Sequence, residues 1–138
     1  DYEIAAFDAA DANGAPIYHT NVLMSVGTKW AAVCTQAIEQ GRRAAIVALL
    51  ESTGHDIIEL TLEQMHSFAG NMLELRTRDG GLVIAMSKTA LDSLAQEQRT
   101  KLESHATIVS APIPTIERLG GGSVRCMIAE VHLPRDGR

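Results

Sequence analysis

Short apolar segments alternate with polar, glycine-containing turns over the first sixty residues, and their spacing predicts the local structure. Two β-rich runs, residues 21–26 and 30–34, flank the turn at 27–29, which is the pattern of a hairpin. Residues 38–52 place apolar side chains on one stripe at helical spacing, and residues 57–60 form another apolar run. The predicted order is strand, strand, helix, strand.

The same order returns in the next part of the chain. After a short helical turn at residues 62–68, the pattern predicts strands at 71–76 and 82–86, a helical region at 90–105 and a strand at 107–109. Strands that alternate with helices in this way indicate the α/β class.

Aligning the two segments reveals an internal repeat. Residues 21–24 (NVLM) align with residues 71–74 (NMLE), and the same step leads to Gly121, at the start of a third apolar run predicted as a strand at 124–131. Repeats of this length indicate units arranged around an axis or stacked on one another. We expect one domain over residues 1–138, a partial ring of ββαβ units at about 16–65, 66–115 and 116–138, the last of them cut short.

Equivalent positions of such repeats meet at one end of the ring axis. His19 with Asn21, Asn71, and Arg125 with Cys126 occupy these positions, so we expect them to converge at one mouth despite their distance in the sequence. Asn71 and Arg125 are therefore candidate substrate-binding residues, with a turn cap and a surface ion pair as their structural alternatives.

Composition and charge narrow the classes of function. Hydrophobic residues make up 46% and charged residues 21%, as in a globular domain, and no apolar run is long enough to span a membrane. A net charge of −5 with 4% aromatic residues argues against a nucleic-acid partner. With only two cysteines and no signal peptide, the chain is expected to be soluble and cytoplasmic, with free thiols.

The two cysteines differ in their surroundings. Cys34, between apolar neighbours, is expected to be a core residue. Cys126 follows the glycine-rich run GGGS at residues 120–123 and adjoins Arg125, whose charge favours a thiolate, so it is a candidate nucleophile. The run continues directly into apolar chain, unlike an expression linker, and it lacks the Lys-Ser or Lys-Thr of a phosphate-binding loop. These residues alone leave a nucleophile and a buried hydrophobe equally open.

A nucleophilic thiol needs a base, and His19 is the candidate because it opens a predicted strand at the equivalent end of its repeat. The other four histidines are expected to be solvated, as is Glu117, although Glu117 could instead orient a base. The sequence contains no CxxC or HExxH motif, so neither a metal nor another cofactor is predicted.

Three blocks of the sequence resemble one known superfamily. They are PIYHTNVLMSVG at residues 16–27, FAGNMLEL at 68–75 and TIERLGGGSVRCMIAEVHLP at 115–134. In this order and separation they resemble the arginine deiminase and amidinotransferase superfamily, the penteins, and within it the citrulline-hydrolase-like branch. The resemblance covers nearly the whole chain. It implies a five-bladed α/β propeller of ββαβ units, of which this chain would be a part.

The resemblance also implies a chemistry and a substrate class. Cys126 would attack the central carbon of a guanidino or ureido amino acid such as arginine or citrulline, while His19 protonates the departing amine and then activates water. Asn21 stands where many members have an acidic residue, and we expect an uncharged amide to suit a neutral ureido substrate. An amidinotransferase that uses the same thiol remains an alternative.

Members of the superfamily are about twice as long as this chain, and their N-terminal halves supply further acidic residues. The chain also begins at Asp1 without a methionine. It is therefore expected to be the C-terminal portion of an enzyme, working with an N-terminal portion that could be a separate chain. A homo-oligomer and a catalytically incomplete binding module are the remaining alternatives.

Overall fold

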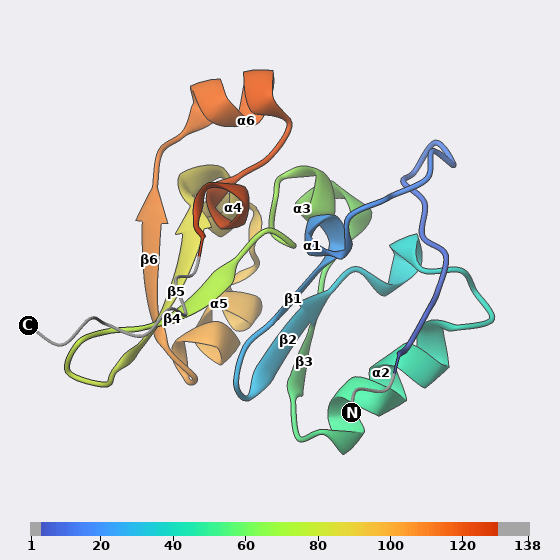
Figure 1. Ribbon diagram of the computed structural model, residues 1–138, viewed down its shortest axis with the longest axis horizontal. Helices are drawn as coiled ribbons and strands as arrows, with labels where there is room; N and C mark the ends of the chain where they lie inside the picture. Colours follow the sequence, from blue (N-terminus) through green and yellow to red (C-terminus); the bar gives the residue numbers. More distant parts are fainter. Residues whose placement is uncertain (1–3, 130–138) are drawn as a thin grey trace, which may run out of the picture.

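The computed structural model describes residues 4–129, which form two three-stranded mixed sheets with helices around them (Figure 1). The first sheet has the order β1-β2-β3, from β1 (Met24–Val26), β2 (Trp30–Val33) and β3 (Asp56–Glu59). Strand β2 pairs antiparallel with β1 and parallel with β3. A tight turn thus joins the first pair, whereas a crossover that contains α2 (Arg43–Ser52) joins the second.

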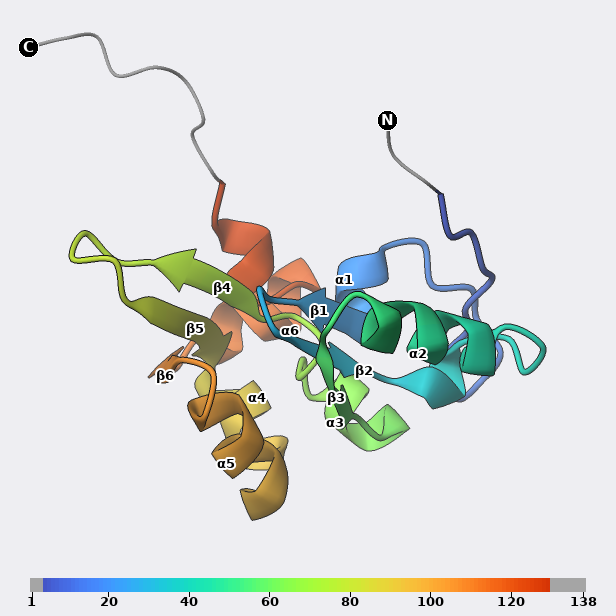
Figure 2. The ribbon, with the colours of Figure 1, turned by 90° about the horizontal axis from the view of Figure 1, so that it is seen from below.

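The second sheet repeats this arrangement. Its order is β4-β5-β6, from β4 (Leu73–Arg76), β5 (Leu82–Ser87) and β6 (Thr107–Ala111), again with an antiparallel and then a parallel pair. The crossover consists of α4 (Lys88–Ser93) and α5 (Gln96–Glu103), which lie on one side of this sheet (Figure 2). The two predicted ββαβ units are therefore present, and they belong to the α/β class.

Five short helices complete the described chain and connect the units. They are α1 (Thr20–Leu23), η1 (Thr35–Ala37), α3 (Leu62–His66), α6 (Pro114–Gly120) and η2 (Val124–Met127), where η denotes a 3-10 helix. Local sequence explains two of them. Helix α3 starts with a capping box between Thr61 and Gln64, and α6 has a proline at its first position and ends at Gly121, whose φ is +67°.

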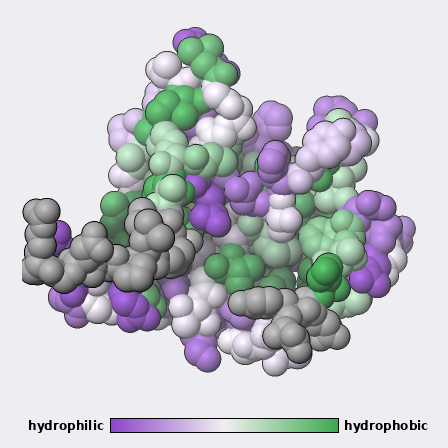
Figure 3. Space-filling view, in the orientation of Figure 1, coloured by the Kyte–Doolittle hydropathy of each residue, from purple (hydrophilic) through white to green (hydrophobic). Residues whose placement is uncertain are grey.

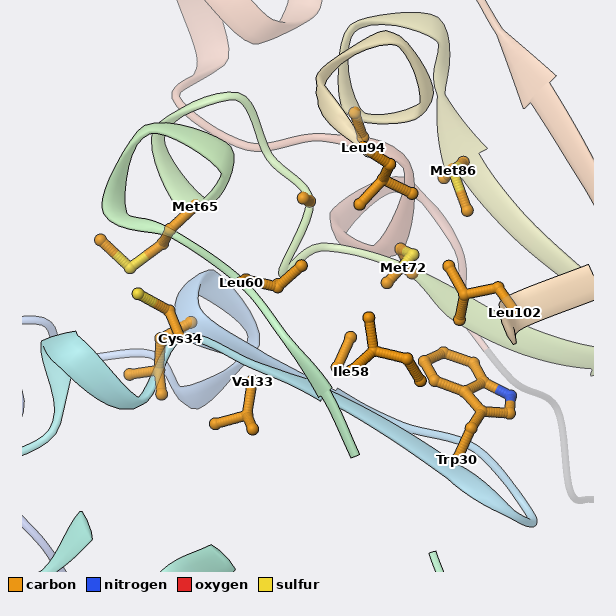
Figure 4. Packing of buried hydrophobic residues seen from close by; sticks show 14 of the residues in the cluster. Trp30, Val33, Cys34, Ile58, Leu60, Met65, Met72, Met86, Leu94 and Leu102 are labelled. Carbon is orange, nitrogen blue, oxygen red and sulfur yellow. The ribbon is translucent and has the colours of Figure 1, made fainter. Parts of the chain in front are cut away.

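A single hydrophobic core extends across both sheets (Figure 4). The Trp30 ring lies close to Ile58 and Leu102, so a side chain of the first unit packs against a helix of the second. Cys34 is fully buried, and burial raises the pKa of its thiol above the ordinary value. The prediction that Cys34 is a core residue is confirmed.

Buried polar groups join the units where β1 meets β4. Ser25 of β1 donates from its Oγ to the carbonyl oxygens of Gly70 (2.6 Å) and Met72 (2.9 Å), and accepts from the Met72 amide at 2.9 Å. Near the other end of β1, Trp30 Nε1 donates to Glu74 Oε2 of β4 at 2.8 Å. The two units are thus connected through hydrogen bonds as well as through apolar packing.

Four predicted elements differ from the structure. Residues 20–23, at the start of the first predicted strand, form helix α1, so His19 precedes a helix instead of opening a strand. The predicted helix at 38–52 begins only at Arg43, and the helical region at 90–105 is interrupted at Leu94, whose backbone is extended. The predicted strand at 124–131 is wrong for its described part, because residues 124–127 form η2.

The reason for this last difference is a local network. The Cys126 amide donates to Ser123 O at 3.0 Å, and the Ile128 amide donates to Arg125 O at 3.3 Å, so these groups are satisfied within a tight turn. Residues 130–131 lie outside the described residues. Within residues 4–129 the two sheets do not close into a ring, and none of the helices there has the length and apolar character needed to cross a membrane.

Candidate active site

A cavity of about 710 Å³ lies between the N-terminal loop, α3, α6 and η2. Figure 3 shows the surface hollowed between the part that carries α6 and the N-terminal loop. The side chains relevant to chemistry on its wall are Asp11, Tyr18, His19, His66, Phe68, Asn71, Thr89, Glu117, Arg118 and Cys126. His19 and Cys126, more than a hundred positions apart in the sequence, therefore face the same cavity.

The thiol of Cys126 is held by an amide from the second unit. Cys126 lies on η2 and is solvent-exposed, and the Asn71 Nδ2 group donates to its Sγ at 3.3 Å. The same Nδ2 donates to the backbone carbonyl of Asn21 at 3.0 Å. One buried amide thus connects the backbone at Asn21 with the thiol of Cys126, and it fixes the sulfur relative to helix α1.

Asn71 reaches this place because the turn before β4 lies directly against α1. A Cβ on Gly70 would lie 2.2 Å from the carbonyl oxygen of Val22, a distance that only glycine avoids. Phe68, at the start of the turn, has φ of +64°, and its carbonyl accepts from the Asn71 amide at 2.9 Å. Such a conformation is rare outside glycine and is found most often where function requires a fixed geometry.

Asn71 itself is almost completely buried, with 2% of its surface exposed. Its Oδ1 has no hydrogen-bond partner among the described residues. A buried amide oxygen without a donor is costly, so Asn71 carries an unsatisfied acceptor next to the candidate site.

The glycine run before Cys126 has a structural role of its own. Gly121 ends α6 in the left-handed conformation, as C-terminal glycines commonly do. A Cβ on Gly122 would lie 3.0 Å from Cys126 Sγ, which is tighter than ordinary contact. The run therefore turns the chain sharply and leaves room for the thiol beside the backbone.

Glu117 is buried, contrary to the expectation of a solvated loop acid. Its exposed fraction is 7%, and its two carboxylate oxygens accept hydrogen bonds from Ser123 Oγ (2.8 Å) and Thr89 Oγ1 (2.7 Å). Burial by itself raises the pKa of Glu117, but the hydroxyls of Ser87, Thr89 and Ser123 outweigh it, so the pKa lies below the ordinary value. Glu117 is therefore a carboxylate at neutral pH.

The structure separates the other predicted site residues. The Asn21 side chain is not on the cavity wall, and only its carbonyl reaches Asn71. Arg125 is half-buried and is likewise absent from the wall, whereas Arg118 of α6 lies on it. Sequence reasoning missed Arg118, although this residue belongs to the quoted block at 115–134.

All the remaining histidines were expected to be solvated, but the structure does not show this for every one of them. His66 lies on the cavity wall, His55 Nε2 lies 3.1 Å from the Gly27 carbonyl oxygen, and His105 Nε2 lies 3.0 Å from Asp56 Oδ2. Two of these histidines thus have structural contacts in the first unit, and His132 lies outside the described residues. Between residues 4 and 129, no three His, Cys, Asp or Glu side chains gather closely enough to hold a metal ion.

Comparison with known proteins identifies the family of this chain. The family model described as N,N dimethylarginine dimethylhydrolase, eukaryotic, matches residues 1–133. The chain belongs to this family. The resemblance to the guanidino-group-modifying pentein superfamily, predicted from three sequence blocks, is thereby confirmed.

Two solved structures share the fold. One is apo ArgZ, described as an arginine dihydrolase from the ornithine-ammonia cycle in cyanobacteria, with a TM-score of 0.63 at 14% identity over 86% of this chain and 17% of that one. The other is the product-bound N-terminal domain of ArgZ, with a TM-score of 0.57 at 17% identity over 80% of this chain and 36% of that one. This chain thus spans about a third or less of each structure. No curated protein sequence matches it at a significant level.

Proposed function

We propose that this chain carries the nucleophile of a hydrolase that acts on the C–N bond of a guanidino or ureido compound. The observation that carries the proposal is the hydrogen bond from Asn71 to Cys126 Sγ, in a cavity that also contains His19. Membership of a family described by the hydrolysis of a methylated arginine supports it, as does the likeness to a protein described as an arginine dihydrolase.

The reaction proceeds through a covalent intermediate on Cys126. The sulfur attacks the central carbon, a C–S bond forms, and the C–N bond breaks as His19 gives its proton to the departing amine. His19 then takes a proton from water, which attacks the same carbon and releases Cys126. The Asn71 amide donates to the sulfur and so stabilises the negative charge that the sulfur carries before the attack.

The cavity fits an amino acid that bears the reacting group on an aliphatic side chain. Met65 and Phe68 contribute apolar surface for the methylene groups, and Arg118 offers a guanidinium for the α-carboxylate. Arg118 takes over the role that the sequence suggested for Arg125. The sequence tied a preference for a ureido substrate such as citrulline to Asn21, whose side chain is not on the cavity wall; we transfer this preference to the neutral Asn71, which contacts the sulfur.

The site is completed by further ββαβ units, in the manner of a five-bladed propeller. This chain covers 17% of one ArgZ chain and contains two such units, and large apolar side chains are exposed, among them Tyr18 on the cavity wall and Leu119 and Met127, which directly follow the wall residues Arg118 and Cys126 in the sequence. Burying these side chains under an N-terminal portion of the enzyme, on the same or a separate chain, would remove a large apolar patch from water.

The test is mass spectrometry of the natively purified protein, together with whatever segments or chains accompany it, during turnover of citrulline, arginine and dimethylarginine. We expect an adduct on Cys126 and release of amine, both lost in Cys126→Ser. Cys34→Ala is the matched control because its thiol is buried away from the cavity, and it should keep the adduct. Turnover that persists in Cys126→Ser would refute the proposal, and transfer of the group to an added amine would favour the amidinotransferase.

A further inference from the structure

The residues around Glu117 form a small polar cluster that the proposed reaction does not use. Glu117 of α6 accepts from Ser123 and Thr89, and the Ser87 hydroxyl contributes to the same carboxylate. Ser87 ends β5 and also caps α4 by accepting from the Ala90 amide at 3.0 Å. Through Thr89, one carboxylate thus connects α6 to the first turn of α4, which Ser87 caps.

The same carboxylate reaches the segment that carries the nucleophile. Ser123 is fully buried and is the residue immediately before η2, and its carbonyl accepts the Cys126 amide at 3.0 Å. Its side chain donates to Glu117 Oε1 at 2.8 Å. A continuous set of hydrogen bonds therefore runs from α4, through Glu117 and Ser123, to the backbone of Cys126.

This connection matters because the backbone just before Ser123 has little restraint of its own. After α6 ends, only Gly121 and Gly122 precede it, and glycines allow more backbone conformations than any other residue. Asn71 holds the sulfur from one side, but a single hydrogen bond to a side chain does not fix the backbone. The Glu117 cluster supplies the second restraint.

We infer that Glu117 is a positioning residue, which fixes the Ser123–Cys126 turn so that the thiol stays aligned with Asn71 and the substrate carbon. This inference rests on the proposed function, since it assigns Glu117 an effect on the thiol chemistry. Glu117 acts through hydrogen-bond geometry and not through its charge on the substrate, because both of its oxygens accept from hydroxyls of the protein. A misplacement of about 1 Å at a reacting atom costs roughly 100-fold in rate.

The first measurement does not depend on activity. Hydrogen–deuterium exchange of the natively purified protein should show the amides of residues 122–128 protected, and Glu117→Ala should raise their exchange rates by about tenfold or more through local opening. Glu97→Gln is the matched control, an exposed acid on α5, and should leave these rates unchanged. Unchanged exchange in Glu117→Ala would overturn the inference even if the enzyme is active.

The second measurement links the turn to catalysis. With kcat normalised to the amount of protein that forms the Cys126 adduct, Glu117→Ala should lower kcat by roughly 10- to 100-fold with little change in KM. Ser123→Ala should have a similar effect, and the double variant should be no worse than either single one. Merely structural damage would lower the adduct-forming fraction and leave normalised kcat unchanged, which would overturn the inference.

A conservative variant separates geometry from charge. Glu117→Gln keeps an acceptor oxygen, and the neighbouring hydroxyls can rotate to accept from its amide, so it should restore most of the normalised kcat. A Gln variant as slow as the Ala variant would overturn the geometric role. If the wild-type protein turns over no guanidino or ureido compound, the proposed function fails, while the exchange experiment still decides whether Glu117 fixes the turn.

Discussion

At the scale of single residues, one amide and one guanidinium shape the candidate site. Asn71 connects the thiol of Cys126 to the backbone at Asn21, and its buried Oδ1 has no donor among residues 4–129. Arg118 brings a positive charge to the cavity wall, whereas Arg125, next to the thiol in sequence, does not lie on that wall. Adjacency in the sequence was therefore a poor guide to which arginine lies on the cavity wall.

Arg118→Ala should raise KM for citrulline by roughly 10- to 100-fold, because a charge-assisted hydrogen bond contributes about 1.5–3 kcal/mol. Steady-state kinetics of the natively purified protein measures this. N-butylurea, which has the ureido group but no carboxylate, provides the internal control and should show the same KM in both proteins. A larger effect from Arg125→Ala than from Arg118→Ala would restore the assignment made from the sequence.

At the scale of elements, the turn between α3 and β4 determines where the site forms. Gly70 lies against the backbone of α1, and Phe68 adopts a left-handed conformation two residues after α3 ends at His66. These contacts place Asn71 where it touches both α1 and η2. The turn therefore positions the amide of the candidate site, although its residues look in sequence like the beginning of a strand.

Gly70→Ala should destabilise the protein by roughly 1–3 kcal/mol, because its Cβ would collide with the carbonyl oxygen of Val22 and backbone moves only at a cost. Urea denaturation gives this change in free energy of unfolding. Gly41→Ala is the matched control, since a Cβ there would meet no atom within 4 Å. Equal effects of the two substitutions would contradict the close approach of the turn to α1.

At the scale of the whole molecule, the two units form one structure because both hydrogen bonds and apolar packing join them. Ser25 bonds to Gly70 and Met72 across the contact between β1 and β4, while the Trp30 ring packs against the helix side of the second unit. The position of Asn71 relative to α1 therefore depends on how the units are joined.

Ser25→Ala should lower the free energy of unfolding by roughly 1–3 kcal/mol, because it leaves the Met72 amide without its bond from Ser25. Thermal or urea unfolding would show a single transition shifted to lower stability. Ser104→Ala offers the comparison, since that exposed hydroxyl bonds only to Lys101 O of its own helix. A change no larger than that of Ser104→Ala would mean that Ser25 does not join the units.

The sequence by itself determined the ββαβ order of the two units and the superfamily. Strand and helix periodicity reflects which face of an element is buried, so the two units could be predicted, and the repeat indicated that the residues near positions 21, 71 and 126 lie together, as their contacts through Asn71 show. The three sequence blocks indicated the superfamily because their residue types and spacing are specific to it.

Only the tertiary structure decided which atoms meet. Three features depend on contacts between segments 6 to 55 positions apart: Asn71 touches the sulfur, Arg118 lies on the cavity wall, and Glu117 is buried under three hydroxyls. Turns at Gly70 and Gly121 set these contacts, and a glycine in sequence does not reveal which backbone it approaches. Periodicity reports on one element at a time, whereas a site is a relation between several elements.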